Sequence, residues 1–191
     1  MAFNPLEAAQ DPEGPINPSP STDDASGGGS SEGGGYAPDE ELPLAGYATL
    51  AAVFTGGAGL FALWARRSGR ALPSDVPPWD LFLLGAATYK TSRLVAKDKI
   101  TSFVRAPFTR RQEVISASEV TDVPRGHGLR LATGELLACP FCLGAWVAGG
   151  LLCGYATVPR ATRLVAAGLT AATVSDWLQY AWSFTQQQVD N

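Results

Sequence analysis

The chain has 191 residues, with 14 Lys and Arg against 18 Asp and Glu, and a formal net charge of −4. Its three cysteines are too few and too clustered for a secreted domain held together by disulfides. Nucleic acid is not expected as a partner, because the basic residues stand beside apolar stretches rather than among exposed stacking aromatics.

Residues 1–43 differ sharply in composition from the rest of the chain. They hold nine of the acidic residues, seven prolines and seven glycines, and no Lys or Arg. Too few large apolar side chains are present to offset the entropy of ordering this segment, so we expect a disordered acidic tail. Neither a basic segment nor an early apolar run follows Met1, which predicts that no signal peptide is cleaved.

The first membrane span is predicted over residues 44–65, which contain no charged residue before Arg66. A charge-free run of this length is what a hydrocarbon core of ~30 Å requires. Gly56, Gly57 and Gly59 form a flat strip on this helix, which would let a neighbouring helix approach closely.

Residues 79–96 can be interpreted in two ways. The first half is apolar on every side, whereas the second half places Lys90, Arg93 and Lys97 on one helical face. These long cations could reach a membrane surface from a spanning helix, or lie in the interface if the helix rests there. We therefore expect an all-α membrane protein with three or four transmembrane helices.

A short amphipathic helix is predicted over residues 98–106, lying in the membrane interface. Asp98 would cap this helix, and its apolar face would be formed by Ile100, Phe103 and Val104. Residues 109–138 are polar and rich in turn-forming residues, which predicts a water-exposed loop with a short hairpin around Gly134.

Two further membrane spans are predicted, over residues 139–158 and 163–183. The first contains no charged side chain from Phe141 onward, which again matches the thickness of a bilayer. Near the end of the second, Trp177 and Tyr180 are typical of an aromatic belt at a membrane surface.

The distribution of Lys and Arg predicts the orientation of these spans. Residues 97–130 carry seven basic residues, the turn at 159–163 carries two, and residues 184–191 carry none. Because cytoplasmic loops are enriched in Lys and Arg, we expect loop 97–138 and the C-terminus to be cytoplasmic in a multi-pass protein of the cell membrane. The side of the N-terminal tail stays open, since it depends on whether 79–96 spans.

Three motifs resemble those of a bacterial membrane-protein family: Tyr89–Val95, Asp98–Thr101 and Cys139–Trp146. The family is the domain of unknown function thirteen-sixty, some members of which are labelled sporulation proteins. The resemblance covers residues 79–182, and the Cys-x-x-Cys-Leu-Gly-x-Trp pattern is its most specific part. It implies a membrane location and supplies no established activity.

The cysteine motif is the main candidate for chemistry. Cys139 at a helix N-terminus would favour a thiolate, as in a thiol–disulfide oxidoreductase, although the cytoplasmic side is reducing. Cys139 and Cys142 could instead pack as small apolar side chains, or bind zinc with His127 and either Glu135 or Asp122. A second Cys or His pair at zinc spacing is missing, so no cofactor is expected and zinc stays an alternative.

Charged residues near the predicted spans form a second group of candidates. Asp176 is the lone acid in its apolar span, where it could carry protons, pair with Arg93 or Lys90, or lie at headgroup level. For Asp98, the resemblance suggests an ion pair with Arg93 or Arg105.

These patterns predict a small integral membrane protein that acts as a scaffold or partner subunit of a membrane assembly. The partners would be anionic lipid headgroups around residues 90–111, and either copies of the chain or another membrane protein. The alternatives are a membrane thiol–disulfide oxidoreductase or metal-binding protein, and a holin-like pore. No phosphate-binding loop, Ser/His/Asp set or pair of catalytic carboxylates is recognisable, so an enzyme is not favoured.

Overall fold

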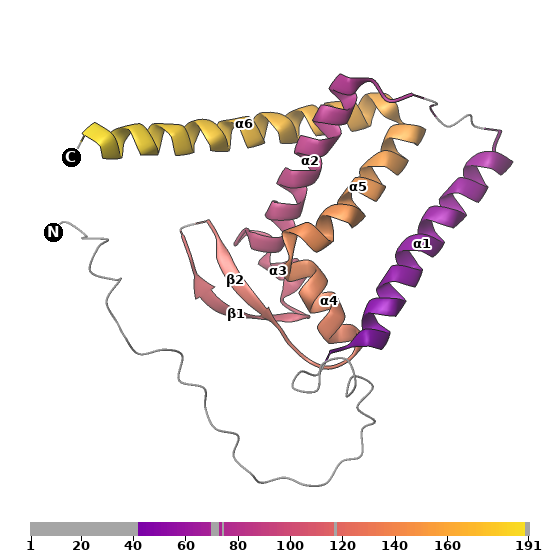
Figure 1. The fold of residues 1–191 in the computed structure, drawn as a ribbon, viewed down its shortest axis with the longest axis horizontal. Coiled ribbons are helices and arrows are strands. Elements are labelled where there is room, and N and C mark those ends of the chain that lie inside the picture. The colour runs from indigo at the N-terminus through magenta and orange to yellow at the C-terminus, as the bar shows by residue number, and fades with distance from the viewer. Residues whose placement is uncertain (1–41, 70–72, 74, 117, 190–191) are drawn as a thin grey trace, which may run out of the picture. The chain divides into compact units, whose positions relative to one another are not determined.

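The computed structural model describes residues 42–69, 73, 75–116 and 118–189, so nearly all of the predicted tail lies outside the described residues. The described residues form six helices and one two-stranded sheet (Figure 1). In chain order these are α1 Leu44–Arg67, α2 Pro78–Lys97, α3 Ser102–Arg105, β1 Thr109–Val114, β2 Val120–Pro124, α4 Leu129–Ala138, α5 Pro140–Thr157 and α6 Pro159–Val189. The fold is mostly helical, but the sheet means that it is not all-α.

Helices α2, α5 and α6 pack around a small shared core. Its buried members are Leu84 and Ala87 of α2, Tyr155 of α5 and Ala166 of α6. Ala87 and Ala166 are fully buried, and small side chains at such positions let helix backbones approach closely. The ambiguous stretch 79–96 is thus a helix that packs between two others.

Prolines begin three of the helices, at Pro78, Pro140 and Pro159. A first-turn N–H has no partner inside the helix, so proline loses nothing there and its fixed φ angle suits the helix. The last helix begins four residues before the predicted span 163–183 and continues six residues beyond it.

The prediction of a loop over 109–138 is wrong. Strands β1 and β2 pair antiparallel, with a bulge between Arg111 and Glu113, and α4 forms the last ten residues of the segment. Gly134 lies inside α4, not in a hairpin. A Cβ atom there would come within 2.6 Å of the Phe108 carbonyl oxygen, so this glycine allows α4 to approach the chain just before β1.

The predicted interfacial helix is also shorter than expected. Helix α3 is a single turn, and the residue that precedes it is Thr101, not Asp98. Asp98 instead follows the last residue of α2 and forms an isolated β-bridge with Glu119. The apolar side chains of this segment are exposed, with Ile100 at 80% and Phe103 at 76%.

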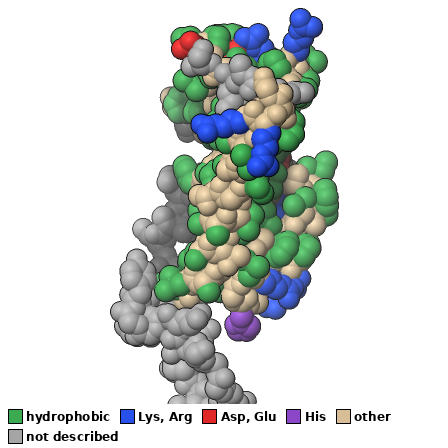
Figure 2. Space-filling model, turned by 90° about the vertical axis from the view of Figure 1, so that its right-hand side faces the viewer, with side chains coloured by type: hydrophobic (Ala, Val, Ile, Leu, Met, Phe, Trp, Pro, Cys, Tyr) green, Lys and Arg blue, Asp and Glu red, His purple; other side chains and the backbone are tan. Residues whose placement is uncertain are grey.

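Two of the described helices, α1 and α5, are long and apolar enough to cross a membrane. Only 6% of the apolar window of α1 and 11% of that of α5 is buried inside the protein. Figure 2 shows the face along α1, where hydrophobic and uncharged side chains fill the middle and basic side chains gather toward the ends. Charged and polar residues interrupt α2 and α6, which therefore fall short of the same criterion.

Candidate functional site

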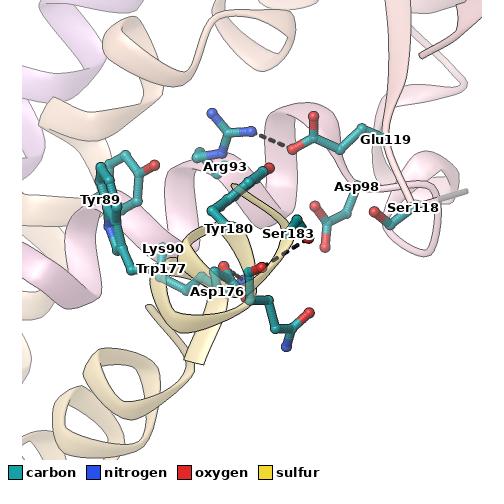
Figure 3. A pocket seen from close by; sticks show the side chains of 11 residues that line it. Tyr89, Lys90, Arg93, Asp98, Ser118, Glu119, Asp176, Trp177, Tyr180 and Ser183 are labelled. Carbon is teal, nitrogen blue, oxygen red and sulfur yellow. Dashed lines mark hydrogen bonds and ion pairs between the residues drawn. The ribbon is translucent and has the colours of Figure 1, made fainter. Parts of the chain in front are cut away.

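A polar pocket lies where α2, α6 and the turn between β1 and β2 converge (Figure 3). We call it the α2–α6 pocket, and its volume is about 630 Å³. Three acids, two bases, three aromatic residues and three uncharged polar residues line it: Asp98, Glu119, Asp176, Lys90, Arg93, Tyr89, Trp177, Tyr180, Ser118, Gln179 and Ser183. Residues from three separate parts of the chain are thus brought together, among them three of the sequence-predicted site residues.

Two ion pairs cross this pocket. Lys90 Nζ lies 2.6 Å from Asp176 Oδ2, which joins α2 to α6. Arg93 pairs with Glu119, which joins α2 to the start of β2. Of the partners predicted for Asp176, the structure selects Lys90, and Arg93 binds an acid that no sequence pattern had indicated.

Asp98 lines the same pocket without an ion pair of its own among the described residues. The predicted pair with Arg93 or Arg105 is wrong, because both arginines bind other acids. Burial raises the pKa of Asp98, and the nearby Lys90 and Arg93 offset part of that rise. Within the described part of the chain, Asp98 is therefore a carboxylate without a cation in contact.

Arg105 is a buried anchor beside the pocket. Its side chain is 0% exposed, and its Nε lies 2.7 Å from Asp122 Oδ2 on β2. It also donates to the carbonyl oxygens of Val95 and Asp98, the latter at 3.1 Å. Carbonyls at the C-terminal end of a helix lack partners within the helix and favour cations, so Arg105 closes the end of α2 and fixes Asp98 at the rim.

A second buried cluster lies at the opposite end of α2, and sequence patterns gave no sign of it. The carboxylate of Asp80 is 3% exposed and accepts a hydrogen bond from the Tyr155 hydroxyl at 2.5 Å. Arg163 donates to both oxygens of Asp80, with Nε at 3.0 and 2.9 Å. The cluster ties the first turns of α2 and α6 to the end of α5, and each of its polar groups has a partner.

The two cysteines of the motif lie at the start of α5. The backbone N–H of Cys142 donates to Cys139 Sγ at 3.2 Å, so Cys139 caps the helix. Burial alone would raise the pKa of Cys139, but hydrogen bonds from Cys142 and nearby backbone groups outweigh it and lower that pKa. All three cysteines are free, and the pair stands next to the 92% exposed side chain of Phe141.

The other predicted ligands of a metal site are engaged elsewhere. Glu135 accepts a hydrogen bond from Tyr47, and Asp122 binds Arg105. His127 is exposed in the turn before α4. Within the described ranges no three His, Cys, Asp or Glu side chains come together, so the predicted zinc set is not assembled there.

Trp146 has a packing role in this structure. Its ring meets that of Phe54 edge to face, with 5.2 Å between the centroids and 61° between the planes. Such aromatic pairs contribute roughly 0.5–1.5 kcal/mol beyond their buried area. The contact holds the middle of α1 against α5.

Comparison with known proteins places these features in a family. The model for "Protein of unknown function (DUF1360)" matches residues 83–182. The Sporulation protein YjcA of Bacillus subtilis (strain 168) is 36% identical over 110 residues, which cover 52% of this chain and 93% of that protein. The UPF0713 protein YngL of the same organism is 32% identical over 81 residues, covering 41% and 58%. No solved structure matches.

Proposed function

The chain belongs to the DUF1360 family of proteins of unknown function, and we propose that it is an integral membrane scaffold or partner subunit. One observation carries this proposal: most of the apolar surface of α1 and α5 is left uncovered by the other described residues. On α1, Val53 is 57% and Leu60 is 70% exposed, and on α5 Leu152 is 49% exposed. Apolar area of this extent favours contact with lipid or with another membrane protein.

Contacts at the helix ends support a multi-pass arrangement. The Tyr47 hydroxyl near the start of α1 donates to Glu135 of α4, on the side of the basic segment. Asp80 and Arg163 join the starts of α2 and α6 at the other end. With loop 97–138 in the cytoplasm, α1 and α5 lead outward and α2 and α6 lead back, which gives four crossings and a cytoplasmic C-terminus.

The charges inside α2 and α6 are compatible with membrane depth because they pair with each other. Lys90 meets Asp176, and Asp80 meets Arg163. Unpaired charge in a bilayer is costly, and pairing within a helix bundle reduces that cost. Exposed apolar side chains on the same helices, such as Phe82 and Leu164, support contact with lipid.

The proposed lipid partner is an anionic headgroup at the cytoplasmic surface. Ile100 and Phe103 are exposed between Lys99 and Arg105, in a segment that also continues to Arg110 and Arg111. Apolar side chains would insert while exposed cations attract anionic lipid, each contributing ~1 kcal/mol near the surface.

We expect the full-length protein to stay in the membrane pellet after alkaline carbonate washing and to be released only by detergent, because α1 and α5 would be embedded in lipid. Chemical cross-linking in these membranes should then yield a species larger than the 20.0 kDa monomer, as a scaffold or partner subunit requires. Release by carbonate would contradict the membrane placement, and a cross-linked sample containing only monomer would contradict the assembly role.

A second candidate function, thiol–disulfide exchange, is favoured by the geometry of the cysteine pair. The Cys139 thiolate would attack a partner disulfide and form a mixed disulfide. Cys142 would then displace the partner, leaving a disulfide here and two thiols on the partner. Two electrons and two protons thus pass from this pair to the partner.

The lowered pKa of Cys139 predicts its reactivity. The Cys139 thiolate should form at a lower pH than the thiolate of a free cysteine, whose pKa is ~8.5. Alkylation of Cys139 should therefore stay fast at pH values where a free cysteine reacts slowly. In the Cys142→Ser variant, whose serine hydroxyl can still donate to Cys139 Sγ, the labelling rate of Cys139 should exceed that of Cys153 in a C139S/C142S control. Equal and slow labelling of both thiols across pH 6 to 9 would remove this candidate.

A further inference from the structure

The charges that line the α2–α6 pocket do not balance. Three carboxylates face two cations, and each cation is already in contact with one acid: Lys90 with Asp176, and Arg93 with Glu119. Asp98 remains without a cation in contact among the described residues. A partly buried carboxylate in that situation is costly, and a positively charged ligand would remove the cost.

The backbone of Asp98 is held in place, so the base of its side chain is fixed at the pocket before any ligand arrives. Its carbonyl oxygen accepts hydrogen bonds from Arg105 at 3.1 Å and from the Thr101 hydroxyl at 3.0 Å. The same residue, just after α2, forms a β-bridge with Glu119, just before β2. A preorganised charge binds its ligand with less loss of conformational entropy than a mobile one.

Aromatic side chains form another wall of the pocket. Tyr89 comes from α2, and Trp177 and Tyr180 come from one face of α6 (Figure 3). Trp177 and Tyr180 are each 66% exposed, so most of each side chain is accessible to a ligand. Aromatic faces attract organic cations, and ammonium groups recognised by such walls are a recurrent arrangement in proteins.

The remaining groups distinguish between classes of ligand. Both basic side chains are engaged in ion pairs, which disfavours an anion as the occupant. A divalent metal ion would need several oxygen ligands at 2.0–2.6 Å, and no such cluster occurs in the parts of the chain described here. Hydroxyl groups of Ser118 and Ser183 can accept N–H hydrogen bonds at the rim.

We propose that the α2–α6 pocket binds a primary or quaternary ammonium group, with Asp98 as its counter-ion and Trp177 and Tyr180 as its aromatic wall. The ammonium group has two sources, a free organic amine or the headgroup of an aminophospholipid. The inference goes beyond the scaffold role, because a ligand in this pocket requires neither a partner subunit nor a particular number of membrane spans.

The test uses full-length protein in detergent, titrated with ethanolamine and with choline and followed by calorimetry. Asp98→Asn should weaken binding at least about tenfold, since it removes a charge-assisted contact while keeping the shape of the side chain. Trp177→Ala should weaken binding by roughly two- to fivefold. Glu113→Gln, an exposed acid of β1 outside the pocket, should bind as the parent does.

Nanodiscs with and without phosphatidylethanolamine separate the two sources. Binding of the free amines in detergent assigns a soluble ligand, whereas a complex seen only with the lipid, and lost in the Asp98→Asn variant, assigns the headgroup. Circular dichroism and size-exclusion profiles establish that each variant is folded. The proposal is overturned by the absence of saturable binding to all of these probes, or by equal affinities of folded Asp98→Asn and parent protein.

Discussion

Replacing Arg105 with alanine is expected to lower the free energy of unfolding by about 3–5 kcal/mol, because it leaves a buried charge without its partner. The guanidinium is fully buried and binds Asp122, while it also donates to Val95 and Asp98 at the end of α2. Its loss would leave the Asp122 carboxylate and two backbone carbonyls without the donor that they share. Urea unfolding in detergent, followed by circular dichroism, measures the change.

Arg111 supplies a matched control for this variant. It lies on β1, is exposed, and donates to the Ser102 hydroxyl at 3.0 Å. Arg111→Ala should therefore cost less than about 1 kcal/mol. Arg105→Lys should fall between the two, since lysine keeps the charge but cannot donate in several directions at once. Equal losses for Arg105→Ala and Arg111→Ala would show that Arg105 is not an anchor.

Uninterrupted apolar runs made the helices predictable. Residues 44–65 and 139–158 contain no charged residue, and the structure has α1 and α5 there with bounds within two residues of those expected. Pro140, just before an apolar run, predicted the start of α5, because proline has no N–H and the first helical position does not need one. Both signals lie within a few residues of the feature that they predict.

Glycine misled the prediction where its role is long-range. Gly126 and Gly128 have positive φ angles and lie in a turn. Gly134 lies within α4, where the absence of a side chain lets the helix pass close to the Phe108 carbonyl. A sequence pattern cannot tell a glycine needed for its φ angle from a glycine needed for close packing of two segments. The packing role of Gly134 depends on Phe108, which is 26 positions away. For that reason the hairpin was expected around Gly134 and not over residues 109–124, and α4 was missed.

Partner choice among charged residues was predictable only in part. Asp176 stood out as the lone acid of an apolar stretch, and a pair with Lys90 was among the predicted options. Glu119 and Asp122 lie in a polar segment where many residues could pair, so their arginine partners carried no signal. The Asp80, Tyr155 and Arg163 cluster joins residues up to 83 positions apart, which only the packing of three helices brings together.

Labelling from the two sides of the membrane decides whether α2, the long helix between Ser68 and Ser116, crosses the bilayer. The starting protein has Cys139, Cys142 and Cys153 replaced by serine, and single cysteines are then placed at Ser68, after the end of α1, or at Ser116, near the hairpin turn. Both positions are exposed in the structure.

In intact cells a membrane-impermeant maleimide should label Ser68→Cys and leave Ser116→Cys unlabelled until the membrane is permeabilised. This result follows from opposite placement of the two ends of α2, with the basic segment in the cytoplasm. Labelling of both positions in intact cells, or protection of both, would contradict a transmembrane α2 and with it the four-span arrangement.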